Sequence, residues 1–148
     1  MPYKIPHSVL VVIHSPDLQV LLLERADHPG YWQSVTGSLD HEEESLVLAA
    51  CREVQEETGL VCDPMRLLDW QQTNEYEIFA HWRHRYAPGV THNTEHVFSV
   101  CVARDAAIQL APREHLQYQW LPWQDAAERC FSWSNAQAIQ RLPQRVNP

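Results

Sequence analysis

The chain has 148 residues, and its 11 basic and 19 acidic side chains give a formal net charge of −8. This length predicts one domain, residues 1–148, that is large enough to bury its own core. The acidic balance argues against broad electrostatic binding of nucleic acid or of an anionic membrane, although it permits a small phosphate site bridged by metal.

Two strands are predicted near the start of the chain, at Ser8–His14 and Gln19–Arg25, with a Ser-Pro-Asp turn between them. The apolar run Val9–Ile13 is short and lacks a cleavage site, so it indicates a strand and not a signal peptide. No stretch approaches the length of a membrane span. We therefore expect a cytoplasmic protein, in which a short strand around Tyr31–Thr36 leads into the next element.

An acidic helix is predicted to follow Gly37 and to end in the run Arg52-Glu53-Val54-Gln55-Glu56-Glu57-Thr58-Gly59-Leu60. On a helix, Glu53 and Glu57 project about 40° apart, and Glu56 lies on the next rung. Carboxylates so close together repel one another, and a divalent cation usually offsets that repulsion. Spacing alone leaves two readings open, a metal site and an acidic face exposed to solvent, which is the more common one for an acidic helix; the resemblance described below favours the metal site.

The other residues of the same helix predict how it packs on the rest of the protein. Val47, Ala50, Cys51 and Val54 form an apolar stripe that would pack on a core, with Glu53 and Glu57 flanking it. Arg52 can pair with Glu56 at i+4, and Gly59 is a natural helix stop.

The second half of the chain predicts further strands and two helices. The helix after Pro122 and the last helix, which a hydroxyl cap at Ser132 or Ser134 would open, complete a mixed α/β arrangement. The four cysteines show no CxxC or finger spacing, which favours reduced thiols. The expected strands lie near Arg66–Gln72, Glu75–Trp82, Glu95–Ala103 and Leu116–Leu121. The expected helices are Trp123–Cys130 and the last helix, which runs from the cap at Ser132 or Ser134 through Arg141.

The segment from Gly37 to Leu60 resembles the Nudix box, a Gly followed by Glu and then by Arg-Glu-apolar-x-Glu-Glu-x-Gly-apolar. Nine consecutive positions, Arg52 to Leu60, match the second half of that pattern. The resemblance implies an α/β/α sandwich with a mixed sheet and a catalytic loop and helix. It also implies a pyrophosphohydrolase that uses Mg²⁺, with Mn²⁺ as a substitute, on nucleoside diphosphates linked to another moiety.

The first half of the box departs from the family pattern. Glu44 keeps the seven-residue spacing to Arg52 but lies one residue too far from Gly37, and the Gly that commonly precedes this Glu is missing. A loop absorbs an insertion more readily than a helix, so we place the extra residue in the loop Ser38–Glu43. Glu44 is expected on a different helical face from Glu53, which favours an orienting role over activation of water.

Three longer sequence segments resemble one subgroup of the family, the bacterial dihydroneopterin triphosphate diphosphatases. They are Tyr31 to Gly37, the stretch Glu77 to Thr91 followed by Asn93-Thr94-Glu95, and Ser132 to Asn135. This resemblance implies hydrolysis of 7,8-dihydroneopterin 3′-triphosphate to the monophosphate and pyrophosphate, an early step of folate biosynthesis.

Residue chemistry and the resemblance together predict the site. Glu53 and Glu57 are expected to bind the metal with help from Glu114, and Glu56 adds a third helix carboxylate as ligand or as general base. Hydrolysis of a triphosphate mainly requires positioning and charge neutralisation. The expected substrate contacts are Lys4, Arg25, Thr36 and Ser132 for the phosphate-bearing part and Tyr76, Glu77, Ile78 and Phe79, on a strand, for the flat ring.

Four other functions are compatible with parts of this sequence. A general nucleoside triphosphate pyrophosphohydrolase acting on substrates such as dATP is the nearest, because a pterin pocket can accept a purine. A Nudix domain that binds nucleotide or RNA without turnover would not need all three helix carboxylates. Zinc pairs such as His81 with His84 lack a Cys partner and would point to opposite faces of a strand. The basic run Arg83–Tyr86 is short for RNA binding, so the expected partner is a small pterin or nucleoside triphosphate.

Overall fold

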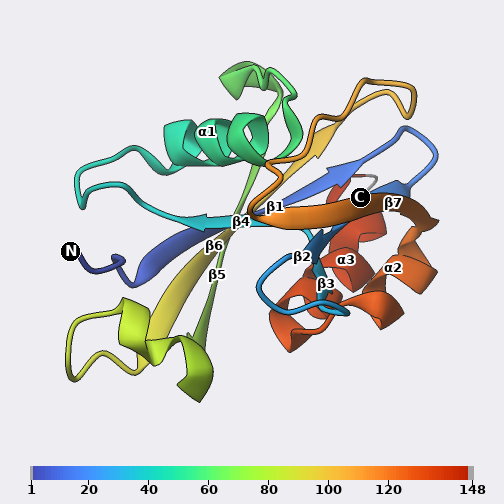
Figure 1. Ribbon diagram of the computed structural model, residues 1–148. Coiled ribbons are helices and arrows are strands. Elements are labelled where there is room, and N and C mark those ends of the chain that lie inside the picture. Colours follow the sequence, from blue (N-terminus) through green and yellow to red (C-terminus); the bar gives the residue numbers. More distant parts are fainter. Residues whose placement is uncertain (1, 147–148) are drawn as a thin grey trace.

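The computed structural model describes residues 2–146, in which one mixed sheet of seven strands separates helix α1 from helices α2 and α3 (Figure 1). The elements are β1 (His7–His14), β2 (Gln19–Arg25), β3 (Trp32–Gln33), β4 (Val35–Ser38), α1 (Leu46–Thr58), the 3₁₀ turn η1 (Pro64–Arg66), β5 (Leu68–Glu77), the 3₁₀ helix η2 (Ala80–Arg85), β6 (His92–Cys101), β7 (His115–Pro122), α2 (Trp123–Arg129) and α3 (Trp133–Val146).

Strand β1 shows how the sequence produces this layering. Its apolar residues alternate between the two faces of the sheet. Val9, Val11 and Ile13 pack in the core that contains Ala50 and Val54 of α1, whereas Leu10 and Val12 pack in the core that contains α2 and α3. Each large side chain buried in this way contributes roughly 1.5–3 kcal/mol. The predicted α/β/α sandwich is therefore confirmed.

The sheet forks on one side of β1. Strand β1 pairs with β6 in parallel along its whole length, but with β2 only at His14 and Val20. Beyond that pair, β4 takes the free edge of β1 and β3 takes the free edge of β2. Ser34 joins β3 to β4, and its backbone N–H donates to Oδ1 of Asn135 on α3 at 2.8 Å. The fork separates two groups of strands that line the site described below.

The prediction of two strands between Arg66 and Trp82 was wrong. A single strand, β5, covers Leu68–Glu77, and a register shift between Asp69 and Thr73 interrupts its pattern where Gln71 has φ 52°. After Ile78 the chain enters η2, in which the backbone N–H of Trp82 donates to the carbonyl of Phe79 at 2.9 Å. Local 3₁₀ bonding thus replaces the expected strand pairing.

The last helix begins where predicted and ends later. Of the two candidate caps, Ser132 is the one used, because its Oγ accepts from the backbone N–H of Asn135 at 3.4 Å. The helix then continues past Arg141, through Pro143, to Val146. Buried Leu142 extends the apolar face beyond the predicted end.

The described part of the chain contains no helix whose length and apolar character would suit it to crossing a membrane. All four cysteines are free thiols.

Candidate active site

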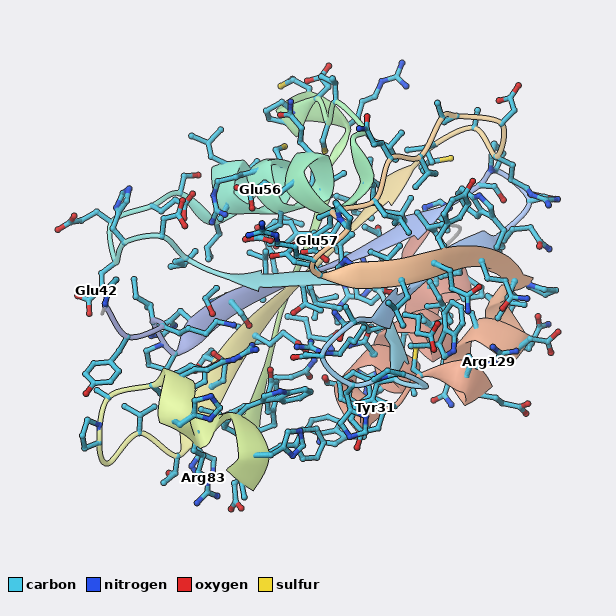
Figure 2. All side chains as sticks on the ribbon, viewed as in Figure 1. Tyr31, Glu42, Glu56, Glu57, Arg83 and Arg129 are labelled. Atoms are coloured by element: carbon cyan, nitrogen blue, oxygen red, sulfur yellow. The ribbon has the colours of Figure 1, made fainter. Side chains whose placement is uncertain are left out.

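Helix α1 turns two of its three site carboxylates inward. Oγ of Ser45 accepts from the backbone N–H of Leu48 at the start of the helix, and Gly59, at φ 76°, ends it as predicted. Glu53 is 9 % exposed and Glu57 is 2 % exposed, whereas Glu56 is open to solvent. Figure 2 shows Glu57 directed from the helix toward the sheet. The two acids that flank the apolar stripe are therefore buried together with it.

Gly37 on β4 makes room for the carboxyl group of Glu53. A Cβ atom at this position would lie 2.1 Å from Cδ of Glu53, far inside van der Waals contact. Gly37 therefore leaves free the space that the end of the Glu53 side chain occupies.

Burial controls the protonation of the two inward carboxyl groups. It raises the pKa of Glu53 and, more strongly, the pKa of Glu57. A hydrogen bond with Glu53 and the charges of Glu53 and Glu114 raise the pKa of Glu57 further. Within residues 2–146, Oε1 of Glu57 has no hydrogen-bond partner. A pair of crowded, buried carboxyl groups with an unused oxygen is a donor set that suits a divalent cation.

His115 lies beside this pair and was not expected in the site. Its Nε2 is 3.4 Å from Oε1 of Glu57, and both side chains are buried. Burial lowers the pKa of His115 to about 4, with a further contribution from Arg25. The imidazole is therefore neutral at pH 7 and does not neutralise Glu57. Its position next to Glu114 in the sequence is the signal that could have drawn attention to it.

Arg52 joins the loop before α1 to the helix. Its guanidinium group donates to Glu44 at 3.0 Å and to Glu53 at 2.7 Å, and it lies 3.4 Å from Glu56. Glu44 in turn accepts from the backbone N–H of Asp40 at 2.7 Å. Glu44 precedes the helix, so the helical-face argument made for it was wrong. These contacts nevertheless give it an orienting position.

The two expected phosphate-binding cations come from opposite sides of the fork. Arg25 ends β2, where it pairs with Asp27 at 2.7 Å and covers the ring of Trp82 at 4.3 Å. Lys4 precedes β1, and an isolated bridge joins it to Tyr86, the residue after η2. Burial lowers the pKa of Lys4, and the charges of Arg85 and Arg25 lower it further. An anion in this position would relieve that repulsion.

A cavity of about 610 Å³ connects these groups. It runs between the carboxylates of α1 and the start of α3, and every predicted site residue lines it: Lys4, Arg25, Thr36, Glu53, Glu56, Glu57, Tyr76, Glu77, Ile78, Phe79, Glu114 and Ser132. As positioned, however, Glu53, Glu57 and Glu114 do not converge as three ligands, because residues 2–146 contain no group of three or more His, Cys, Asp or Glu side chains arranged for a metal ion.

The ring-binding segment differs from the prediction in its structure. Only Tyr76 and Glu77 belong to β5; Ile78 is buried, and Phe79 is 43 % exposed where η2 begins. The backbone of Ile78 is occupied internally, since its N–H donates to Thr91 and its carbonyl accepts from Arg83. The main chain at Ile78 is therefore already paired within the protein.

The segment that contains His81, Arg83, His84 and Arg85 also differs from the prediction in its structure and contacts. His81 and His84 belong to a 3₁₀ helix, so the argument from opposite strand faces did not apply to them. Arg83 pairs with Glu77 at 2.8 Å and Arg85 pairs with Asp27 at 3.2 Å. These arginines neutralise acids beside the cavity.

Several cavity residues were missed. The aromatic rings of Trp82, Phe131 and Trp133 line it, as do the polar side chains of Asn93 and Glu95 on β6. The signal for the last two was present in the sequence, because polar residues at i and i+2 precede an apolar Val97 on the same inward face of a strand.

The comparisons agree with this geometry. The profile of the NUDIX domain matches residues 4–142. Dihydroneopterin triphosphate diphosphatase of Escherichia coli K12 is 51 % identical over 143 residues, covering 95 % of this chain and 93 % of the relative. The enzyme of the same name from Haemophilus influenzae is 40 % identical over 95 % of this chain and 89 % of its own length.

Solved structures match over the same length. The E. coli dihydroneopterin triphosphate pyrophosphohydrolase has a TM-score of 0.89 and 46 % identity, with both chains fully covered. A Caenorhabditis elegans Ap4A hydrolase shares the fold at a TM-score of 0.73 and 20 % identity, with 95 % of this chain and 96 % of the other covered. From the profile, the relatives and the helix of acids packed on a forked sheet, it follows that the chain belongs to the NUDIX family.

Proposed function

We propose that this protein hydrolyses 7,8-dihydroneopterin 3′-triphosphate to dihydroneopterin monophosphate and pyrophosphate, as a step of folate biosynthesis. The observation that carries the proposal is the 51 % identity to the E. coli diphosphatase over 95 % of this chain. It is supported by a single cavity that holds crowded carboxylates, two cations and aromatic rings together. The free thiols of the protein suit a cytoplasmic location.

The carboxylates have separate proposed roles. Glu53 and Glu57 would hold Mg²⁺, or Mn²⁺ in its place, and Glu114, on the turn that precedes β7, would complete the ligand set from the cavity lining. The bound cation would neutralise phosphate charge and make a water molecule more nucleophilic. Glu56 remains either a further ligand or the base that accepts the proton of that water, and its exposed position at the cavity suits both.

The remaining residues position the substrate. Lys4 and Arg25 would bind the triphosphate from the two sides of the fork, which aligns it with the carboxylates of α1. Thr36, beside Gly37, and Ser132, at the start of α3, would supply hydroxyl contacts. Tyr76 and Glu77 with Ile78 and Phe79 would border the ring.

Phosphorus NMR in ¹⁸O-labelled water tests the reaction directly. The purified protein is incubated with dihydroneopterin triphosphate and Mg²⁺, and pyrophosphate with dihydroneopterin monophosphate is the expected product pair. The product that carries the label identifies the phosphorus that water attacks. No turnover of this substrate, together with rapid cleavage of dATP, would overturn the proposal in favour of a nucleotide pyrophosphohydrolase.

A further inference from the structure

Two buried polar residues of β6, Asn93 and Glu95, line the cavity in addition to the carboxylates of α1. Asn93 and Glu95 are two residues apart on β6, so they point to the same face, and both line the cavity. Asn93 is 1 % exposed and Glu95 is 2 % exposed. Neither residue has a role in the hydrolysis proposed above. A carboxyl group at such depth requires an explanation.

Asn93 has an unused hydrogen-bonding group. Its Nδ2 donates to Oγ of Ser8 at 2.7 Å and to the hydroxyl of Tyr76 at 3.1 Å. Its Oδ1 has no partner within residues 2–146. Turning the carboxamide over would leave the NH₂ group unpaired instead, so one end of the side chain lacks a partner in either orientation. Buried polar groups rarely remain unpaired, which indicates that a ligand supplies the missing contact.

Glu95 is only weakly satisfied by the protein. Nδ2 of Asn74 lies 3.5 Å from Oε1, and the hydroxyl of Ser134 also donates to the carboxyl group. No Lys, Arg or His in the described part of the chain forms an ion pair with it. Burial raises the pKa of Glu95 to about 7. Additional N–H donors would favour its ionised form.

The pterin ring carries such donors. One edge of its 2-amino-4-oxopyrimidine ring presents an amino N–H and the neighbouring ring N3–H side by side, and a carboxylate can accept both. Adenine presents an amino donor beside the acceptor N1 and therefore opposes a carboxylate. Exposed faces of Phe79 and Trp133 also border the cavity, where they are available to stack on a flat ring.

We propose that Glu95, assisted by Asn93, binds the amino edge of the pterin ring and is the residue that selects pterin over adenine. This inference rests on the proposed function, because it assigns the ring end of the same cavity. Glu95 contacts the ring and not the phosphates, so its removal changes the choice of substrate more than the chemistry of cleavage.

Glu95→Gln is the decisive variant, because it keeps the shape of the side chain and replaces one acceptor with a donor. We expect kcat/KM for dihydroneopterin triphosphate to fall by about 100-fold, since sites built for hydrogen bonding reject a mismatched edge strongly. For dATP we expect no fall, because a carboxamide matches the adenine edge. Glu75→Gln is the matched control: Glu75 lies on neighbouring β5, is exposed and does not line the cavity, so the substrate ratio should remain that of the wild type.

Retained cleavage of dATP shows that the variant is folded. An unchanged ratio of the two kcat/KM values in Glu95→Gln would overturn the inference, whether both values stay at the wild-type level or fall equally. A second measurement needs no mutation: the wild type should cleave a substrate analogue without the 2-amino group at least about 30-fold less efficiently, and equal efficiency would contradict the assignment. Absence of dihydroneopterin triphosphate cleavage by the wild type would instead reject the proposed function.

Discussion

Glu57 combines almost complete burial with an oxygen that has no hydrogen-bond partner in the described residues. An ionised carboxylate in that position lowers the stability of the metal-free protein, and Glu53 beside it increases the effect by like-charge repulsion. The same two groups give a cation its strongest attraction. For Glu53 and Glu57, the charge that would attract a cation is therefore the same charge that destabilises the metal-free protein.

Replacing Glu53 or Glu57 by Gln is expected to lower kcat by about 10³-fold or more, because the cation would lose a charged ligand. Each variant should remain folded and, without metal, should melt at a higher temperature than the wild type. Steady-state kinetics and thermal unfolding with EDTA measure the two effects. The control is Glu42→Gln, whose exposed side chain lies in the preceding loop, and wild-type turnover in either folded Glu53 or Glu57 variant would remove the proposed metal site.

Gly37→Ala tests the contact between β4 and α1. Its Cβ would lie 2.1 Å from Cδ of Glu53, so the carboxyl group must move, and we expect a loss of roughly 1–3 kcal/mol in unfolding free energy together with at least about tenfold lower kcat.

The control for this variant is Gly30→Ala. Gly30 has φ +94° but nothing within 4 Å of an added Cβ, so it should lose stability through backbone strain while kcat is kept. A Gly37→Ala enzyme with normal kcat would show that Glu53 needs no fixed position.

The loop and helix around Arg52 act as one element. Glu44 and Asp40 on the loop and Glu53 on the helix all contact the same guanidinium group. Between Asp40 and Glu44, the side chains of His41, Glu42 and Glu43 are exposed. We therefore expect the contacts of Arg52 to survive a change in the length of this segment.

Deleting Glu42 should leave kcat/KM within about tenfold of the wild type, since an exposed turn can shorten without moving Asp40 or Glu44. Steady-state kinetics on the deletion variant measures this. Complete loss of activity in a folded protein would show that the longer loop itself is required.

Elements with strong local signals were predicted well, and elements fixed by distant partners were not. The bounds of β2 and the stop of α1 at Gly59 follow from alternation and from a left-handed cap, both local. The single strand β5 depends on its pairing with β6 across a register shift, which local sequence does not encode. The first half of the 3₁₀ helix η2 was mistaken for the end of a strand because Trp82, and Phe79 just before the helix, are residue types that also favour strands.

The same distinction applies to the site. Glu53, Glu56 and Glu57 share one helix and were predicted from their spacing together with the resemblance of the run that contains them. The membership of Lys4, Arg25 and Ser132 in one cavity came from resemblance, because three separate segments meet there only in the folded chain. His115 and Glu95 were missed for the same reason: their significance depends on what packs against them.

The stability of the whole molecule should depend on pH through Glu95. The folded pKa is about 7, above the ordinary value of 4.5, so the folded state holds this proton more tightly and loses stability as pH rises from about 4.5 through 7. Relative to the wild type, Glu95→Gln should therefore gain roughly 3 kcal/mol of unfolding free energy between pH 4.5 and pH 8.

Chemical denaturation of both proteins across this range gives the difference curve. The lowered pKa values of His14, His96 and His115 produce the opposite trend at lower pH, but they contribute equally to both proteins and cancel in the difference. A flat difference curve would show that Glu95 titrates normally.

The forked sheet also has a mechanical consequence. Strands from both sides of the fork line the cavity together with parts of α1, η2 and α3, and the strand pair at His14 and Val20 joins the two sides. A triphosphate held by Lys4 on one side of the fork and by Arg25 on the other would link the two sides. Binding of the triphosphate would then also stabilise the strand pair at His14 and Val20, where slower amide hydrogen exchange would report a ligand bound far from the exchanging groups.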